Sequence, residues 1–219
     1  MIVYEKIFKK YGLSSTQQEI IKTVGSGKLI LEIGSSTGYM TRAFLENNCV
    51  VDVVESDKEA VSKLPKIHQI FNTSIEDENI FTKLNKYDFI IMADVLEHLV
   101  NPDQTLKKLF NISSAKTKLI ISLPNIACWA MRKQLFFKGD FEYQESGLLD
   151  KTHLHFYTVN TLPKILFNNG WETGRIRGTI TRLPLEGLTG RIPFVYPWLV
   201  KRFKNLAYYH FLIIASKKQ

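Results

Sequence analysis

An apolar run breaks into a glycine-containing turn at Leu29-Ile30-Leu31-Glu32-Ile33-Gly34-Ser35-Ser36-Thr37-Gly38. The run is typical of a buried strand, and residues 39–45 after the turn have the composition of a helix. In open α/β sheets, ligands bind outside the carboxyl ends of the strands, and glycine in the first turn lets a ligand approach the backbone closely. The segment therefore predicts an α/β fold with a ligand site at residues 34–38.

A nicotinamide cofactor in its usual setting is disfavoured at this turn. The dinucleotide-binding pattern G-x-G-x-x-G is absent, because three residues without glycine separate Gly34 from Gly38. A P-loop pattern is absent as well. An NAD-dependent oxidoreductase is therefore the least favoured hypothesis for the function of the chain.

The turn resembles motif I of the class I S-adenosylmethionine (SAM)-dependent methyltransferases, [DE]-x-G-x-G-x-G. Glu32, Gly34 and Gly38 match this motif, and Ser36 stands where the family has its middle glycine. The resemblance implies that SAM is bound here and is released as S-adenosylhomocysteine (SAH). Because Ser36 departs from the motif, a non-catalytic SAM-binding or scaffold protein of the same fold is the main alternative. The residues implied at the cofactor in this turn are Glu32, Gly34, Ser35, Ser36, Gly38 and Tyr39.

A second acid follows the next strand. Residues 49–54 form a β-branched run that ends at Glu55, 21 positions beyond Gly34. Nucleotide-binding α/β folds place a carboxylate here to accept hydrogen bonds from the ribose hydroxyls. We therefore expect Glu55 to bind the ribose of the cofactor, with Ser56 beside it.

Two later segments extend the resemblance. Ser74 and Ile75 stand where the family has a G-D-x-E-like segment that meets the adenine. Residues 93–98, Ala-Asp-Val-Leu-Glu-His, look like the D-V-L-E-H segment that follows strand four in many small-molecule methyltransferases. The resemblance implies that this second segment contacts the cofactor through Ala93, Asp94, Val95 and His98.

A third resemblance closes an irregular segment, residues 126–156, which is expected to be an inserted lid or substrate-binding segment. Residues 149–158 resemble the D-x-T-H-x-x-F-[FY]-T signature of methyltransferases often associated with glycan or lipopolysaccharide assembly. A hydroxyl acceptor must lose a proton, and histidine titrates near neutrality. His98, His153 and His155 are therefore the candidate bases. We expect His153 to act as the base or to position the acceptor hydroxyl, with His155 on the same face and Asp150 orienting one of them.

The favoured activity is O-methylation of a sugar or another small acceptor, either free or lipid-linked, in a single domain spanning residues 1–219. The family resemblance implies a Rossmann-like, seven-stranded, mostly parallel sheet of order 3-2-1-4-5-7-6 with helices on both faces. Helices are expected at residues 39–46 and 161–168, and another should begin at Pro102 with Asn101 as its N-cap. The expected strands are residues 28–33, 49–54, 67–71, 88–91, 118–123, 171–180 and 208–216.

The net charge of +8 is unevenly distributed. From Thr161 to the end there are ten Lys and Arg residues against two Asp and Glu residues, so this part carries the whole excess. Residues 181–207 are a basic, aromatic connector, and its segment 191–204 interleaves rings and cations in a way that suits an anionic membrane surface. No nucleic-acid partner is expected.

The chain begins without the apolar region of a signal peptide. Cys49 and Cys128 are far apart and fit no metal-binding spacing, so reduced core thiols are expected and no metal site is predicted. These features favour a cytoplasmic protein, peripheral to the inner face of the membrane.

Overall fold

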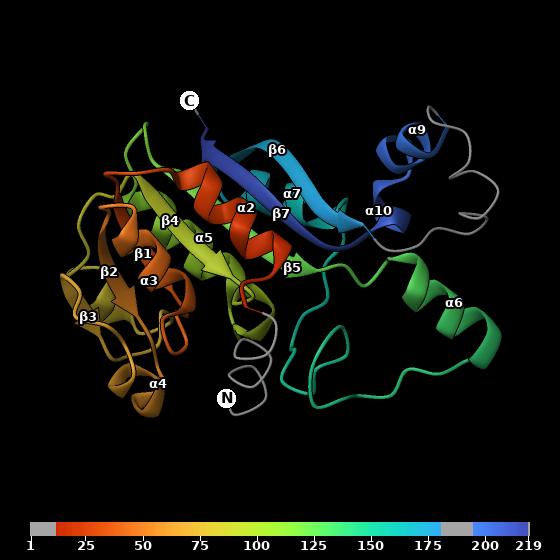
Figure 1. The fold of residues 1–219 in the computed structure, drawn as a ribbon, viewed down its shortest axis with the longest axis horizontal. Coiled ribbons are helices and arrows are strands. Elements are labelled where there is room, and N and C mark those ends of the chain that lie inside the picture. The colour runs from red at the N-terminus through yellow and green to blue at the C-terminus, as the bar shows by residue number, and fades with distance from the viewer. Residues whose placement is uncertain (1–11, 181–194, 219) are drawn as a thin grey trace.

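The computed structural model describes residues 12–180 and 195–218. Its centre is a seven-stranded sheet of order β3-β2-β1-β4-β5-β7-β6, which confirms the predicted fold (Figure 1). Neighbours from β3 to β5 pair in parallel, whereas β7 runs antiparallel to both β5 and β6. The strands are β1 Leu29–Ile33, β2 Val50–Val54, β3 Gln69–Phe71, β4 Phe89–Ala93, β5 Lys118–Pro124, β6 Trp171–Ile180 and β7 Tyr208–Lys217.

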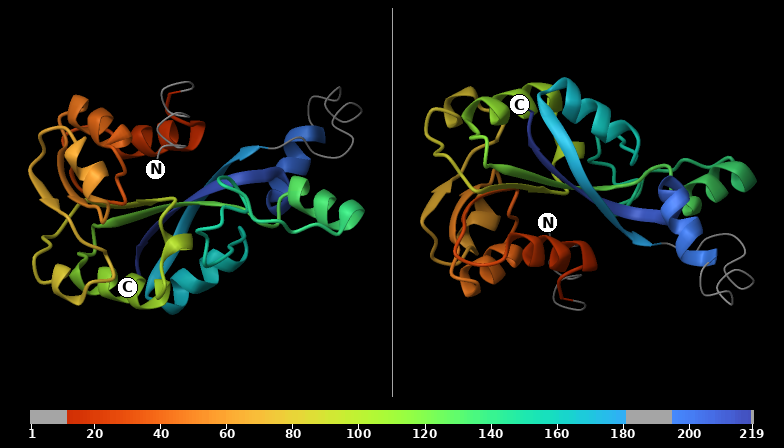
Figure 2. Two further views of the ribbon diagram at one scale, coloured as in Figure 1. Left: turned by 90° about the horizontal axis from the view of Figure 1, so that it is seen from below. Right: turned by 90° about the horizontal axis from the view of Figure 1, so that it is seen from above.

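Helices cover both faces of the sheet (Figure 2). Helices α2 and α3 pack on one face, and helices α5 and α7 pack on the other. The described helices are α2 Ser15–Val24, α3 Tyr39–Glu46, α4 Lys58–Ser62, α5 Pro102–Ile112, α6 Trp129–Lys138, α7 Thr161–Asn168, α9 Val195–Arg202 and α10 Lys204–Ala207, with 3-10 turns η1 Glu78–Ile80 and η2 Leu96–His98.

The core is divided by the sheet because successive side chains of a strand point to opposite faces. In β1, Ile30 packs in the layer of α2 and α3, together with Phe44. Its neighbour Leu31 packs in the other layer, together with Leu106 of α5. Both faces of β1 are therefore buried, which explains the nearly continuous apolar run in its sequence.

The first turns of α2 and α5 are held by different hydrogen bonds. Ser14 caps α2 through a capping box with Gln17, and α5 begins at Pro102 as expected. However, the side chain of Asn101 makes no capping bond. Asn101 nevertheless occupies the predicted N-cap position, and the carboxylate of Glu76 accepts its N–H at 2.6 Å and the Val100 N–H at 3.1 Å.

Between β5 and α7 the chain leaves the sheet and forms α6 and long connecting loops (Figure 1). Helices α9 and α10 lie at the same end of the molecule, and α10 contacts α6. Of the predicted connector, residues 181–194 lie outside the described part of the chain.

Among the described residues, none of the helices is long and apolar enough to span a membrane. Cys49 and Cys128 are both buried free thiols, as expected.

Candidate functional site

Two cavities lie along the carboxyl edge of the sheet, and they share Gly34, Asp94 and His98. The larger one, which we call the main cavity, has a volume of about 390 Å³, and the smaller one, the second cavity, has about 270 Å³. Among the predicted site residues, the main cavity is lined by Glu32, Gly34, Ser35, Ser36, Tyr39, Ala93, Asp94, His98 and His153. The second cavity is lined by Gly34, Glu55, Ser56, Ser74, Ile75, Asp94, Val95 and His98.

The turn after β1 needs its glycine for a steric reason. Gly34 has a positive φ of 70°, and a Cβ there would lie 2.5 Å from Cγ2 of Val95. Ser36 also has a positive φ, 52°, so it adopts the left-handed conformation that glycine favours in the family motif. Its N–H donates to Oε2 of Glu55 at 2.8 Å, which ties this turn to the end of β2.

Gly38 differs from the other predicted cofactor residues because it lines neither cavity. It caps α3 with a φ of 82°, and a Cβ there would lie 2.9 Å from Cδ2 of Leu64 and 3.0 Å from Cδ of Pro65. The motif residue Gly38 therefore shapes the start of α3.

Glu32 is a buried acid at the wall of the main cavity. Only 1% of its surface is exposed, and Oε2 accepts a hydrogen bond from Oγ1 of Thr41 at 2.6 Å. Its other oxygen, Oε1, has no hydrogen-bond partner among the described residues. Burial raises the pKa of this carboxyl to about 8. A cationic ligand group would satisfy the free oxygen and favour the ionised form.

Glu55 lies where β2 ends and lines the second cavity. It is buried, and its two oxygens accept the N–H groups of Ser36 at 2.8 Å and Asp57 at 2.9 Å. These bonds hold the carboxylate in one orientation, while each oxygen keeps a further lone pair for an incoming hydroxyl. A strand-end acid for a ribose diol and a buried acid for an ammonium group together fit SAM.

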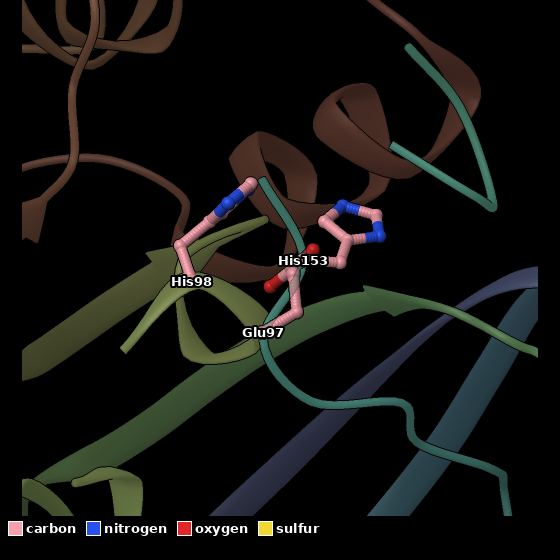
Figure 3. Close-up of side chains that lie close together, drawn as sticks. All are labelled: Glu97, His98 and His153. Atoms are coloured by element: carbon pink, nitrogen blue, oxygen red, sulfur yellow. The ribbon is translucent and has the colours of Figure 1, made fainter. Parts of the chain in front are cut away.

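Glu97, His98 and His153 gather at the wall of the main cavity, and we call them the Glu–His–His cluster (Figure 3). Glu97 and His98 end the turn η2 after β4, whereas His153 comes from the segment between β5 and α7. The peptide N–H groups of Leu154 and His155 donate to the backbone oxygen of Glu97 at 2.8 and 3.1 Å. The backbone itself therefore joins the two distant segments.

The other two residues predicted to be catalytic lie apart from the main cavity. The carboxylate of Asp150 is buried and accepts the N–H of Thr152 at 2.9 Å and its hydroxyl at 2.6 Å, so it shapes the turn that carries His153. His155 lines different hollows, one beside His153 and one beside α5, together with Tyr157. The expectation that His155 shares the face of His153 therefore does not describe the main cavity.

Two functional candidates escaped the predicted list. The sequence places Glu97 in a motif, but only the structure brings its side chain next to His153. His210 also lines the main cavity, and its Nε2 lies 2.6 Å from Oδ1 of Asp94. No local signal marks His210, because it reaches the site only through the antiparallel pairing that sets it beside Pro124.

Comparisons with known proteins identify the family of the chain. A model of the methyltransferase-domain family matches residues 6–174, whereas no curated protein sequence matches the chain. Among solved structures, a SAM-dependent methyltransferase from Thermotoga maritima, described as a possible histamine N-methyltransferase, is 16% identical with a TM-score of 0.67; the match covers 98% of this chain and 94% of that one.

Two further structures share the fold. A SAM-dependent methyltransferase from Archaeoglobus fulgidus is 14% identical with a TM-score of 0.66, and the match covers 98% and 99% of the two chains. Magnesium protoporphyrin IX methyltransferase from Synechocystis PCC 6803, crystallised with bound SAM, is 15% identical with a TM-score of 0.57, and the match covers 93% of this chain and 78% of that one. Because the family model covers most of the chain and the cavity residues fit SAM, the protein belongs to the class I SAM-dependent methyltransferases.

Proposed function

We propose that this protein transfers the methyl group of SAM to a hydroxyl of a sugar or another small, lipid-linked acceptor. The observation that carries the proposal is the Glu–His–His cluster, which places two imidazoles and a buried carboxylate at the wall of the main cavity. A scaffold that only binds SAM would have no use for such a cluster. The resemblance of residues 149–158 to glycan-type methyltransferases supports the choice of acceptor.

The proposed arrangement of the cofactor follows from the two acids. Glu55 accepts hydrogen bonds from the ribose hydroxyls in the second cavity, where Ser74 and Ile75 line the space for the adenine. Glu32 accepts a hydrogen bond from the ammonium group in the main cavity. Gly34 and Asp94 border both cavities and therefore lie alongside the middle of the bound molecule.

Bound SAM supplies a methyl group on a positively charged sulfur. The acceptor oxygen forms the new bond to the methyl carbon, the C–S bond breaks, and its electron pair stays on sulfur, so no acid is needed for the leaving group. The protein must align the reactants and activate the hydroxyl, which loses its proton. We assign this activation to His153, whose side chain is only 7% exposed.

The chemistry of His153 suits that role. Burial, together with the neighbouring ring of His98, lowers the pKa of His153, so its imidazole is neutral at neutral pH. A neutral imidazole offers a lone pair to a reacting group, whereas the protonated ring offers none. Activity should therefore fall as the pH drops through the lowered pKa of His153.

Exposed aromatic side chains on α6 and α9 form a candidate membrane-contact surface, which supports the choice of a lipid-linked acceptor. Helix α6 exposes Phe136 and Phe137 by 82% and 68%, and α9 exposes Trp198 by 60%. These helices project together from one end of the molecule (Figure 2). Helices α6, α9 and α10 also carry basic side chains, so aromatic insertion and attraction to anionic headgroups would act together. The exposed or half-buried cations are Arg132, Lys133, Lys138, Lys201, Arg202 and Lys204.

The first prediction concerns Glu55. Glu55→Ala should weaken SAH binding by about 1.5–3 kcal/mol, the range for a hydrogen bond to a charged group, which raises Kd about 10- to 150-fold. Isothermal titration calorimetry measures this change. Glu59→Ala removes an exposed carboxylate on the neighbouring helix α4 and should leave Kd unchanged. An unaltered affinity in Glu55→Ala would contradict the assignment of Glu55 to the ribose.

The second prediction concerns His153. His153→Asn should lower kcat by roughly 10²–10⁴-fold, the range for loss of proton-transfer catalysis, with SAH affinity nearly intact. The acidic limb of the pH–rate profile should disappear with it. His68→Asn, which alters an exposed histidine paired with Asp52 in β2, is the control. A purely structural His153 would instead show a lower Tm and weaker SAH binding with only a modest loss of rate.

The third prediction concerns the membrane surface. The protein should co-sediment with vesicles that contain an anionic lipid more than with neutral vesicles, and added salt should weaken this binding. Phe136→Ser combined with Phe137→Ser should reduce it, whereas Phe167→Ser, an exposed phenylalanine on α7, should not. Equal binding to anionic and neutral vesicles would rule out this surface as an anionic-lipid contact.

A further inference from the structure

The Glu–His–His cluster contains a carboxylate in an unusual environment. Glu97 is only 2% exposed, and neither of its carboxylate oxygens has a hydrogen-bond partner among the described residues. Burial, followed by the negative charges of Asp94 and Asp150, raises the pKa of Glu97 well above its usual range. A buried carboxyl group without donors is costly, and a bound cation would remove the cost.

The two histidines are oriented in the way that metal-binding histidines usually are. Nδ1 of His98 lies 3.1 Å from the backbone oxygen of Thr152, and Nδ1 of His153 lies 3.3 Å from that of Leu148. A carbonyl oxygen can only accept, so each Nδ1 carries the hydrogen and each Nε2 keeps a free lone pair. Such a bond from the opposite ring nitrogen commonly fixes the tautomer of a histidine ligand.

The three side chains are close enough to share one ion. One ligand atom from each of Glu97, His98 and His153 lies within 4.8 Å of the others, and the two ring centroids are 4.9 Å apart. In Figure 3 the carboxylate of Glu97 lies just below the two imidazole rings. Bonds of ~2.1 Å to a tetrahedral ion would separate these atoms by ~3.4 Å, so small side-chain rotations would complete the site.

We propose that Glu97, His98 and His153 bind one divalent transition-metal cation, of the class of Zn²⁺ or Co²⁺. Two imidazoles and one carboxylate suit these ions, and a three-residue site leaves a position open for a further ligand. The open position faces the main cavity, which the same three residues line. The sequence spacing predicts no metal site, because the ligands come from segments that are 55 residues apart.

The inference rests on the proposed function and changes one part of it: with the ion bound, His153 is a ligand, and the ion takes over from the free imidazole the activation of the acceptor hydroxyl. The acceptor hydroxyl occupies the open position of the ion, which lowers the pKa of that hydroxyl. Its O–H bond breaks and the proton passes to water at the cavity mouth. The metal-held oxygen then bonds to the methyl carbon, and the electron pair of the C–S bond stays on sulfur. The ion changes neither its charge nor its oxidation state.

The test begins with metal binding alone, on protein stripped with a chelator. Titration with Co²⁺ should give one equivalent bound per chain, with visible d–d absorption that Zn²⁺ abolishes by displacement. Glu97→Gln, His98→Asn and His153→Asn should each weaken Zn²⁺ binding by at least about tenfold, because even loss of a residue that only orients a metal ligand costs 10–100-fold. Zn²⁺ should raise the Tm of the wild type but not that of Glu97→Gln.

The matched control is His155→Asn, which removes an imidazole two residues from His153 but outside the cluster. It should bind Zn²⁺ as the wild type does. Absence of stoichiometric Co²⁺ binding, or binding that the cluster variants leave unchanged, would overturn the metal site. If the stripped enzyme methylates its acceptor as fast as the loaded one, the role of the ion is wrong and the proposed function stands. If Zn²⁺ binds as expected but no hydroxyl acceptor is methylated, the proposed function itself fails.

Discussion

The parallel pairing of β1 between β2 and β4 determines which side chains meet at the ligand edge of the sheet. The register sets Ile33 beside Val54 on one side and Met92 on the other, so the turns that follow all three strands open at the same edge. The N–H of Gly34 donates to the oxygen of Val54 at 2.8 Å, which extends this pairing into the turn itself. Both cavities depend on this alignment.

The pairing also concentrates negative charge at one edge. The carboxyl groups there are Glu32, Glu55, Asp94, Glu97 and Asp150, and all except Asp94 are buried. Burial raises the pKa of Glu32 and Glu97, and Oε1 of Glu32 and both carboxylate oxygens of Glu97 have no hydrogen-bond partner among the described residues, so these two acids are costly until something positive binds beside them. The sulfonium and ammonium groups of SAM supply positive charge, and the proposed cation would supply more beside Glu97. Helices α6 and α9, which carry exposed basic side chains, project from one end of the molecule (Figure 2).

The sequence predicted the elements more completely than the contacts. Helices α3 and α7 and strand β6 have the predicted boundaries, because local periodicity and turn residues define them. Glu55 and Ser74 reach the second cavity as expected, since strand-end positions follow from the fold. Two contacts could not be predicted from the sequence. They are the hydrogen bond that Glu76 accepts from the N–H of Asn101 at the start of α5, and the pairing of His210 with Asp94. Both join residues that are distant in the chain. The same reason hid the proximity of Glu97 to His153.

The most direct test of this account is a crystal structure of the protein with SAH. We expect the ribose hydroxyls to lie within hydrogen-bond distance of Glu55, with the ammonium group at Glu32 and the sulfur facing His153 across the main cavity. A nucleoside bound outside the second cavity, or a sulfur turned away from the Glu–His–His cluster, would contradict it.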